Sequence, residues 1–371
     1  HRVDREPFGS VVDVVALDRR RAVRALVGGE AAGEGGVAAA VLADDLLLAL
    51  EELGRVPDRS GSHELDRLSE VAFDDVAVDT DLDLLEEHVN PEHLPHAVMI
   101  DCTANEFVAS QYAKWLARGV HVITPNKKAF SGSYADYEAL QAAADEGSSH
   151  YFYETTVGAA LPIISTLCDL IHTGDEVRSI RGIFSGTLAY LFNVYDGSKP
   201  FSEIVRAAQQ NGFTEPDPRD DLSGMDVARK LTILARELGQ KIEIGDFPIQ
   251  SLVPEPLRAC SVEEFLERLP QHDAEIDALY QRASAENKKL RYVATLDAAG
   301  NASVGLDAVG VDHPFSNINL TDNIVQFETQ RYSANPLVVQ GPGAGPEVTA
   351  AGVFADLLRL ANYLSTGEGY V

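Results

Sequence analysis

The clearest hydrophobic pattern in the chain lies between residues 97 and 124. An apolar run over 97–100 leads into the polar segment DCTAN at 101–105, apolar residues recur at helical spacing over 107–116, and a second apolar run covers 120–123. A strand, a helix and a strand with short connections form a βαβ unit, which requires a parallel sheet. Ligands bind at the carboxyl ends of such strands, so 101–105 and 124–128 are the first candidates for a binding site.

The N-terminal residues extend this pattern. Residues 11–17 (VVDVVAL) predict a first strand, 22–27 the start of a helix, and 37–43 a second strand. Strands that alternate with helices indicate an α/β fold with a parallel sheet. We therefore predict a Rossmann-like, dinucleotide-binding domain over residues 1–148.

The pattern changes at about residue 149. Aromatic and β-branched residues precede an apolar helix that starts near 161, and the stretches 290–309 and 323–332 alternate as antiparallel strands do. These features predict an α+β domain with a mixed sheet over residues 149–340. The glycine-rich segment 341–345 opens a last helix, and we expect residues 341–371 to complete the first domain.

Composition excludes several classes of protein. A formal net charge of -28 argues against nucleic acid, because phosphate binding needs clustered Lys and Arg. No run of 18 apolar residues predicts a membrane span. The start has no apolar segment of the kind found in signal peptides, and the three cysteines form no CxxC pair. We therefore expect a cytoplasmic protein with reduced thiols, although the chain lacks an initial Met.

Carboxylates crowd the segment just before one lysine. Residues 214–226 read TEPDPRDDLSGMD, and Lys230 follows Asp226 at a spacing of four, on the same helical face. Such a pair is ordinarily a weak surface ion pair, and the segment is equally compatible with a charged turn rigidified by two prolines. Crowded carboxylates repel one another unless they hold a cation, such as a substrate ammonium group or the lysine itself. A lysine placed there can exchange a proton with a substrate oxygen.

Two further segments are weaker candidates. Lys127 and Lys128 follow the second strand of the βαβ unit, where they are either solvated lysines in a turn or part of the ligand edge of the sheet. The GPGAG segment at 341–345 precedes a helix whose first N–H groups attract anions or carbonyl dipoles. A glycine hinge before a helix cap would have the same sequence.

Taken in order along the chain, these segments resemble the homoserine dehydrogenase family. The motifs DCTAN, VHVITPNKKAF, YETTVGAALPI, GIFSGTLAYLFN, GFTEPDPRDDLSGMDVARKLTILAR and GPGAG…VTAAGVFADLL carry the resemblance over roughly residues 97–360. The resemblance implies a dimeric, cytoplasmic enzyme, with the second domain binding substrate and forming the dimer. Its implied reaction is the reversible, NAD(P)-dependent reduction of aspartate 4-semialdehyde to homoserine. We expect the chain to carry neither the regulatory domain nor the fused aspartate kinase that some family members have.

The resemblance also implies roles for individual residues. Lys230 would exchange the proton with the C–O group and Lys127 would assist it. The residues implied to bind substrate are Glu215, Asp221, Asp226, Gly186 and Thr187. Those implied at the cofactor are Thr103, Asn126, Lys127, Gly345 and Thr349. Glu154, Val157, Ala159 and Leu161 match the segment that holds a monovalent cation, Na or K, in family members.

One segment departs from this family. A dehydrogenase of this kind needs Gly-x-Gly-x-x-Gly after its first strand, so that the pyrophosphate can approach backbone N–H groups. This chain has DRRRAVR at 18–24, and a second candidate, Gly33-x-Gly35, reads as a surface loop. Arg19, Arg20 and Arg21 would have to pair with phosphates directly, which favours NADP, whereas Asp44 at the end of the second strand favours NAD.

Direct pairing by the arginines competes with two alternatives. The first ~70 residues could be misread, for instance by a frameshift, or the chain could have lost cofactor binding and act as a binding subunit without turnover. A dehydrogenase for another amino-acid semialdehyde is a further alternative, which the EPDPRDDLSGMDVARK segment disfavours.

Overall fold

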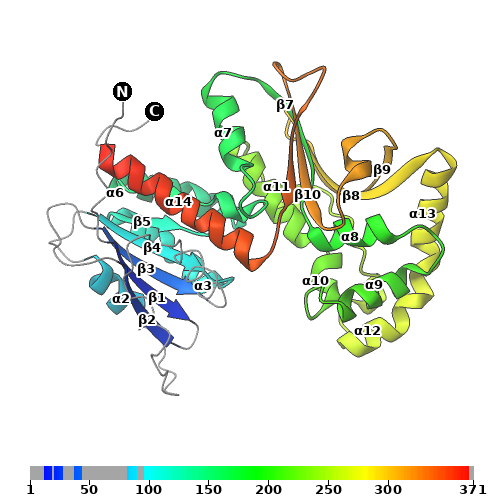
Figure 1. The fold of residues 1–371 in the computed structure, drawn as a ribbon, viewed down its shortest axis with the longest axis horizontal. Coiled ribbons are helices and arrows are strands. Elements are labelled where there is room, and N and C mark those ends of the chain that lie inside the picture. Colours follow the sequence, from blue (N-terminus) through cyan, green and yellow to red (C-terminus); the bar gives the residue numbers. More distant parts are fainter. Residues whose placement is uncertain (1–11, 19–20, 28–36, 44–81, 91–95, 367–371) are drawn as a thin grey trace, which may run out of the picture. The chain divides into compact units, whose positions relative to one another are not determined.

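The computed structural model describes residues 12–18, 21–27, 37–43, 82–90 and 96–366. The chain divides into two compact units (Figure 1). The first comprises His1–Ala129, Ala135–Tyr153 and Thr349–Val371, and the second Phe130–Tyr134 and Glu154–Val348. The boundary therefore falls inside α5 (Lys128–Ser131) and near the start of α14 (Pro346–Thr366).

The first unit is built on a six-stranded sheet. Its order is β2 (Arg21–Val27), β1 (Val12–Asp18), β3 (Val37–Ala43), β4 (His96–Cys102), β5 (Val120–Ile123) and β6 (Tyr151–Phe152). Every pair from β1 to β6 is parallel, which confirms the Rossmann-like sheet. The helices of this unit are α2 (Leu82–Val89), α3 (Glu106–Ala109), α4 (Tyr112–Ala117), α6 (Tyr134–Gly147), which begins at the boundary, and α14 from Thr349 on.

The predicted helix at 22–27 is wrong. Residues 21–27 form β2, which runs antiparallel to β1 and pairs Asp18 with Arg21. An antiparallel partner satisfies the backbone groups that would otherwise lie unpaired at the outer edge of β1. Within the described residues 21–27, the chain after β1 is therefore a strand, whereas in dinucleotide-binding folds a helix N-terminus binds the pyrophosphate there.

The βαβ unit predicted at 97–124 is confirmed. All four residues of β5 are buried, and so are the five central residues of β4. Helix α4 covers them with Tyr112, Trp115 and Leu116, which are fully buried. The Asn105 side chain accepts from the N–H groups of Phe107 and Val108 and so caps α3 at the end of β4.

The second unit contains a five-stranded sheet. Its order is β11 (Leu337–Pro342), β10 (Asp322–Thr329), β7 (Val177–Ile183), β8 (Lys288–Asp297) and β9 (Ala302–Gly310). All four pairings are antiparallel, so the α+β class is confirmed but the sheet is not mixed. A parallel partner appears as an isolated bridge between Ile249 and Val304. Between β8 and β9, the turn at 298–301 returns the chain directly beside the strand it left, as antiparallel pairing allows.

The helices of the second unit are α7 (Ile164–His172), α8 (Gly186–Val194), α9 (Phe201–Gln210), α10 (Pro218–Leu222), α11 (Met225–Glu237), α12 (Val262–Arg268) and α13 (Asp273–Ala285). Of these, α8, α11 and α13 pack directly on the strands of the sheet. Short 3₁₀ turns lie in the connections at Glu154–Thr156, Ile244–Asp246, Glu255–Leu257, Leu269–His272 and Pro314–Asn317. No described helix is long and apolar enough to cross a membrane.

A buried arginine fixes α8 against β8. Arg291 is 3% exposed and donates to the backbone oxygens of Phe192 and Phe315 at 2.7 and 2.9 Å, and to Asn193 Oδ1 at 2.9 Å. Burial lowers the pKa of this guanidinium to about 10, and carbonyl and amide oxygens satisfy its N–H groups. Because Phe192 and Asn193 lie in the last turn of α8, Arg291 fixes the helix whose first residues are Gly186 and Thr187.

Candidate functional site

Lys230 lies on the buried face of α11. Its side chain is 9% exposed, and its Nζ donates to the Phe184 oxygen at 2.7 Å and pairs with Asp226 Oδ2 at 2.7 Å. The spacing of four residues predicts the Asp226 pair, but a surface pair would leave the lysine in solvent. Here the ammonium group is held between a carboxylate and a carbonyl that lies 46 residues away in the chain. This arrangement gives the amine a defined position from which to exchange a proton.

Gly224 sets where α11 begins. It has φ 73° at the N-cap, a left-handed conformation that disfavours other residues. A Cβ at this position would lie 1.9 Å from the hydroxyl oxygen of Tyr292. Only glycine therefore lets α10 turn into α11 against β8, and this turn brings Asp226 and Lys230 beside Phe184.

Asp221 connects the carboxylate-rich segment with the first turn of α8. Its Oδ2 accepts from the backbone N–H of Glu215 at 2.8 Å, and its side chain is hydrogen-bonded to that of Thr187. Burial raises the pKa of Asp221, while these hydrogen bonds partly lower it. The Thr187 hydroxyl also donates to the Phe213 oxygen at 2.8 Å. Asp221 therefore orients the backbone at Glu215, an exposed residue.

Gly186 allows the start of α8 to pack closely. A Cβ there would lie 3.1 Å from the Thr321 oxygen, immediately before β10. Ser185 caps α8 by accepting from the Leu188 N–H. The structure thus brings together Gly186, Thr187, Glu215, Asp221, Asp226 and Lys230, the predicted substrate residues and the predicted catalytic lysine of the second unit.

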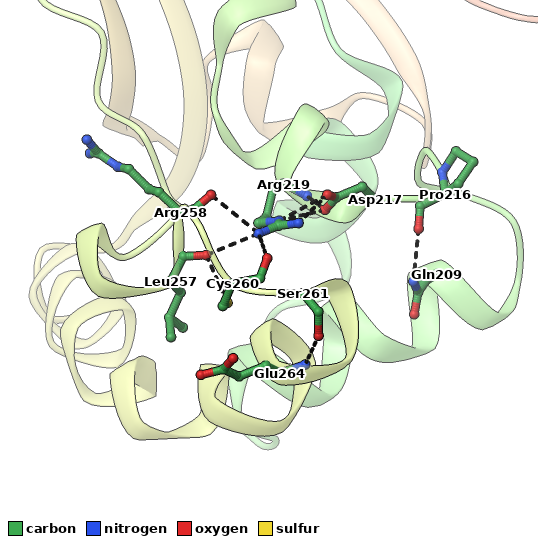
Figure 2. Close-up of polar contacts among 9 residues, drawn as sticks. All are labelled: Gln209, Pro216, Asp217, Arg219, Leu257, Arg258, Cys260, Ser261 and Glu264. Atoms are coloured by element: carbon green, nitrogen blue, oxygen red, sulfur yellow. Dashed lines mark hydrogen bonds and ion pairs between the residues drawn. The ribbon is translucent and has the colours of Figure 1, made fainter.

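Asp217 and Arg219, which lie among these carboxylates, form a structural anchor instead (Figure 2). Asp217 caps α10 and pairs with the Arg219 guanidinium, with Nη2 to Oδ2 at 2.6 Å. The other end of the guanidinium donates to the Cys260 oxygen at 2.6 Å and more weakly to two neighbouring carbonyls. Sequence reasoning grouped Asp217 with the cation-binding carboxylates. The signal against this was its place before Pro218, since an Asp followed by a Pro is typical of a helix N-cap and first turn.

At the carboxyl ends of β4 and β5, one buried carboxylate connects the two strands. Asp101 is fully buried and accepts from the Thr103 N–H at 2.7 Å, from Asn126 Nδ2 at 3.1 Å and from the Tyr112 hydroxyl. Burial raises the pKa of Asp101, and these donors act in the opposite direction. The Thr124 hydroxyl donates to the Asp101 backbone oxygen at 2.7 Å. The network sets the shape of both segments that sequence analysis placed at the ligand edge.

This network uses side chains that were predicted to bind cofactor. Asn126 Nδ2 also donates to the Asn105 oxygen at 3.0 Å, and its Oδ1 accepts from the Lys128 N–H at 3.1 Å. The Thr103 hydroxyl accepts from the Asn105 N–H at 3.1 Å. The structure therefore gives Thr103 and Asn126 a role in shaping these loops. Lys127, which follows Asn126, is half-buried and belongs to the first unit.

The segment matched to a cation site contains an unusual turn. Gly158 and Ala159 have φ of 83° and 53°, and left-handed residues in succession turn backbone groups in directions that helices and strands do not allow. The Glu154 carboxylate accepts from the N–H groups of Ile163, Ile164 and Ser165 at 2.7–2.9 Å. It therefore caps α7, a role that sequence reasoning missed. Among the described residues, no cluster of His, Cys, Asp and Glu could hold a metal ion.

The remaining predicted residues lie around α14 and before β2. Gly345 has φ 124° and directly precedes α14, and Thr349 lies in the first turn of that helix. Only glycine adopts such a φ readily, so Gly345 is a conformational requirement of the entry into α14. Arg19 and Arg20 lie outside the described residues, as does the Gly33-x-Gly35 segment.

Comparisons with known structures agree with this architecture. A crystal structure of a Candida auris protein of unknown function superposes with a TM-score of 0.80 at 35% identity, covering 94% of this chain and 99% of the other. A hyperthermophilic archaeal homoserine dehydrogenase in complex with NADPH gives a TM-score of 0.64 at 20% identity, covering 94% and 97%. At that identity, the archaeal enzyme indicates a shared fold alone.

Sequence comparisons identify the family. The plant bifunctional aspartokinase/homoserine dehydrogenase 1 of Arabidopsis thaliana is 53% identical over 76% of this chain, but the match covers 32% of its own length, so this chain spans about a third of such relatives. The homoserine dehydrogenase of Schizosaccharomyces pombe is 47% identical over 77% of this chain and 78% of its own length. Family models for the homoserine dehydrogenase NAD-binding domain and for homoserine dehydrogenase match residues 33–154 and 162–358. The chain therefore belongs to the homoserine dehydrogenase family.

Proposed function

We propose that this chain catalyses the reversible, NAD(P)-dependent reduction of L-aspartate 4-semialdehyde to L-homoserine, a step in threonine and methionine biosynthesis. The observation that carries the proposal is the environment of Lys230. Its buried ammonium group contacts the Phe184 backbone oxygen and the Asp226 carboxylate, near the turn in which Asp221 accepts from the Glu215 N–H. Such a site can bind an amino-acid ammonium group with its carboxylates and protonate a carbonyl oxygen with its lysine.

Each residue has a proposed task. Lys230 donates a proton to the aldehyde oxygen during reduction and accepts one from the homoserine hydroxyl in the reverse direction, with Lys127 assisting. Asp226 keeps the Lys230 side chain aligned, as their 2.7 Å contact suggests. Glu215 and Asp221 bind the substrate ammonium group. Gly186 and Thr187 line the pocket, where Thr187 also supports Asp221.

A nicotinamide coenzyme, NADP or NAD, supplies the hydride when bound. The family match of residues 33–154 and the NADPH complex of the archaeal neighbour support this class of cofactor. The strand ends at 101–105 and 124–128 fit it, because the Asp101 network leaves two pre-shaped loops at the ligand edge of a parallel sheet. Thr103, Asn126 and Lys127 would contact it there, and Gly345 and Thr349 would lie near the nicotinamide.

The position after β1 fits the pyrophosphate less well, since β2 replaces the usual helix. We therefore propose that Arg19, Arg20 and Arg21 supply side-chain charges to the phosphates. Guanidinium groups bind phosphate in bidentate fashion, which compensates in part for missing backbone donors.

A monovalent cation, Na or K, is proposed at the turn of Glu154, Val157, Ala159 and Leu161. The left-handed residues at 158 and 159 suit ligation by backbone carbonyl oxygens, since hard cations prefer oxygen ligands. The Glu154 carboxylate is already engaged by the start of α7, so it is expected to contribute more to the turn than to the ion.

The proposal extends to assembly and organisation. We propose a cytoplasmic homodimer built through the second domain, 149–340, with residues 1–148 and 341–371 forming the cofactor domain. Small molecules are its expected ligands.

The test is direct. The purified protein is mixed with aspartate semialdehyde and NADPH or NADH, and oxidation of the coenzyme is followed at 340 nm. We expect turnover with at least one coenzyme and formation of homoserine, identified by mass spectrometry. Turnover with other semialdehydes but not with aspartate semialdehyde would overturn the substrate assignment.

A second candidate is a catalytically impaired relative that acts as a binding subunit. One observation favours it, the strand at 21–27 in place of the helix that binds pyrophosphate. A fluorescence titration with NADPH distinguishes the two. No binding of either coenzyme, together with binding of homoserine measured by calorimetry, would favour the subunit without turnover.

A further inference from the structure

A single backbone carbonyl, that of Phe184, accepts hydrogen bonds from two buried side chains. Lys230 Nζ donates to it at 2.7 Å and Asn323 Nδ2 at 3.2 Å. Phe184 follows β7 and directly precedes the N-cap of α8, and Asn323 is the second residue of β10. The carbonyl therefore connects the proposed proton donor with a residue that sequence analysis did not single out.

Asn323 is buried in an incomplete hydrogen-bonding environment. Its side chain is fully buried, and its Oδ1 has no hydrogen-bond partner among the residues that the structure describes. A buried acceptor without a partner is destabilising, and such groups are uncommon in folded proteins. An apolar residue of β-branched shape would suit this central strand better. A function beyond stability would account for an amide at this position.

The orientation of the amide is tightly defined. Rotating it by half a turn would place Oδ1 against the Phe184 oxygen, two acceptors facing each other. Gly343 packs directly against the amide, since a Cβ there would lie 2.1 Å from Asn323 Nδ2. The amide therefore presents its N–H group to the carbonyl that also holds Lys230.

Two effects of this geometry act on Lys230 in the same direction. The two bonds of 2.7 and 3.2 Å laid end to end keep Lys230 Nζ within about 6 Å of Asn323 Nδ2. At such distances the positive end of the amide dipole disfavours a second positive charge. The amide also shares the lone pairs of the carbonyl, which leaves less of its electron density for the ammonium group.

We infer that Asn323 is a positioning residue that acts through the Phe184 carbonyl to orient the Lys230 side chain and to reduce its affinity for a proton. A general acid works best when it gives up its proton near the working pH, which a lysine in water does not. By reducing the proton affinity of Lys230, Asn323 thus brings the loss of its proton closer to the working pH. The catalytic meaning of this inference rests on the proposed function, whereas its effect on proton affinity does not.

Other titratable groups lie on α11 and on the elements packed against it. On the elements packed against it they include Asp221 on α10, Cys168 on α7, Tyr292 on β8, Asp307 on β9 and Asp246 in the following 3₁₀ turn, besides Asp226 on α11 itself. All of them are unchanged in variants at position 323. A displacement of the Lys230 titration in such variants therefore reports the loss of the Asn323 amide.

The test uses the full chain with ¹³C-labelled lysine. The Lys230 signal is assigned by its loss in Lys230→Met, and its titration midpoint is measured by NMR in the parent, in Asn323→Ala and in Asn323→Asp. The control is Gln326→Ala, which removes another amide with an unpartnered buried oxygen from the same strand, opposite Arg181 in the register. Asn323→Ser, whose hydroxyl is too short to maintain the 3.2 Å bond, replaces any variant that does not fold.

We expect the midpoint to rise in Asn323→Ala, and by about 1 unit or more in Asn323→Asp, because a nearby opposite charge stabilises the ammonium form. It should stay at the parent value in Gln326→Ala, because that amide does not contact the Phe184 carbonyl. In the enzymatic assay, Asn323→Ala should lower kcat by about tenfold with little change in the KM for semialdehyde, and should move the alkaline limb of the pH profile upward.

An unmoved Lys230 midpoint in both variants, or an equal displacement in Gln326→Ala, would overturn the inference. The NMR measurement needs no turnover. A displaced midpoint in a chain without activity would therefore support the inference and contradict the proposed function. Turnover with an unmoved midpoint would do the reverse.

Discussion

Replacing Lys230 by Met separates the chemistry of its amine from its contribution to packing. The lysine is 9% exposed, so truncation to Ala would leave a cavity, whereas Met has a flexible unbranched chain that occupies much of the same space. The Phe184 oxygen keeps its bond from Asn323 in the variant, and Asp226, which is 47% exposed, can be solvated. The site therefore loses its charge with little other disturbance.

The expected magnitudes differ between stability and activity. A hydrogen bond from a charged donor contributes about 1.5–3 kcal/mol, but removing a buried charge also removes its desolvation cost. These terms oppose each other, so we expect the free energy of unfolding to change by about 1 kcal/mol. A general acid contributes on the order of 10²–10⁴ in rate, which corresponds to about 3–5 kcal/mol in the activation barrier.

The assay compares kcat for semialdehyde reduction with urea unfolding of the same preparations. Arg229→Met is the matched control, since it removes a neighbouring positive charge from the same helix. It should retain kcat within about threefold, as expected for a residue outside the reaction. A folded Lys230→Met variant with kcat within tenfold of the parent would refute the assignment of Lys230 as the proton donor.

Three further predictions address the surrounding structure. Arg219→Ala should lower the free energy of unfolding by about 1–3 kcal/mol, which is the usual contribution of charged hydrogen bonds discounted for partial exposure. Urea titrations measure this change, and an unchanged stability would contradict the anchor role of Arg219. Arg219 lowers the pKa of Asp217. The stability that this pair contributes is therefore fully present above the ordinary pKa of Asp and is lost as the pH falls through the lowered pKa of Asp217. On acidification, the parent should lose more stability than Arg219→Ala. Glu215→Gln should raise the KM for semialdehyde by roughly 10- to 150-fold, equivalent to about 1.5–3 kcal/mol, and equal losses for coenzyme would mean that the turn is structural. If Arg19–Arg21 contact phosphates, the KM for coenzyme should rise with added salt, and binding that is tight and independent of salt would make these arginines bystanders.

The local hydrophobic pattern was sufficient to predict the βαβ unit of β4, α4 and β5. Strands β4 and β5 are continuous apolar runs because both faces of a parallel sheet are buried, and this signal needs no knowledge of the rest of the chain. The region after β1 shows the limit of the same reasoning. The sequence RAVRALV suits a helix by propensity, but it forms β2 because β1 offers an unpaired edge.

The same division holds within the candidate site. The spacing of Asp226 and Lys230 predicts their ion pair, and the crowded carboxylates predict a cation site, since both follow from chemistry within one short segment. Sequence reasoning did not distinguish Asp217 from Asp221, although the position of Asp217 before Pro218 is typical of a helix N-cap. Asp217 pairs with Arg219, which anchors the segment to carbonyls about 40 residues away, whereas Asp221 is half-buried beside Thr187 and accepts from the Glu215 N–H.

What the sequence by itself determined is therefore the family and the parallel sheet, and it predicted candidate reactive groups, because motifs and periodicity are local properties. The tertiary structure decided which of those groups are buried, and which distant backbone atoms hold them. Lys230 is a surface lysine by its spacing, and it is a buried ammonium only because β7 and β10 bring Phe184 and Asn323 to it. Burial and long-range hydrogen bonds depend on how sheets and helices pack, and packing sums contacts between residues that no local pattern connects.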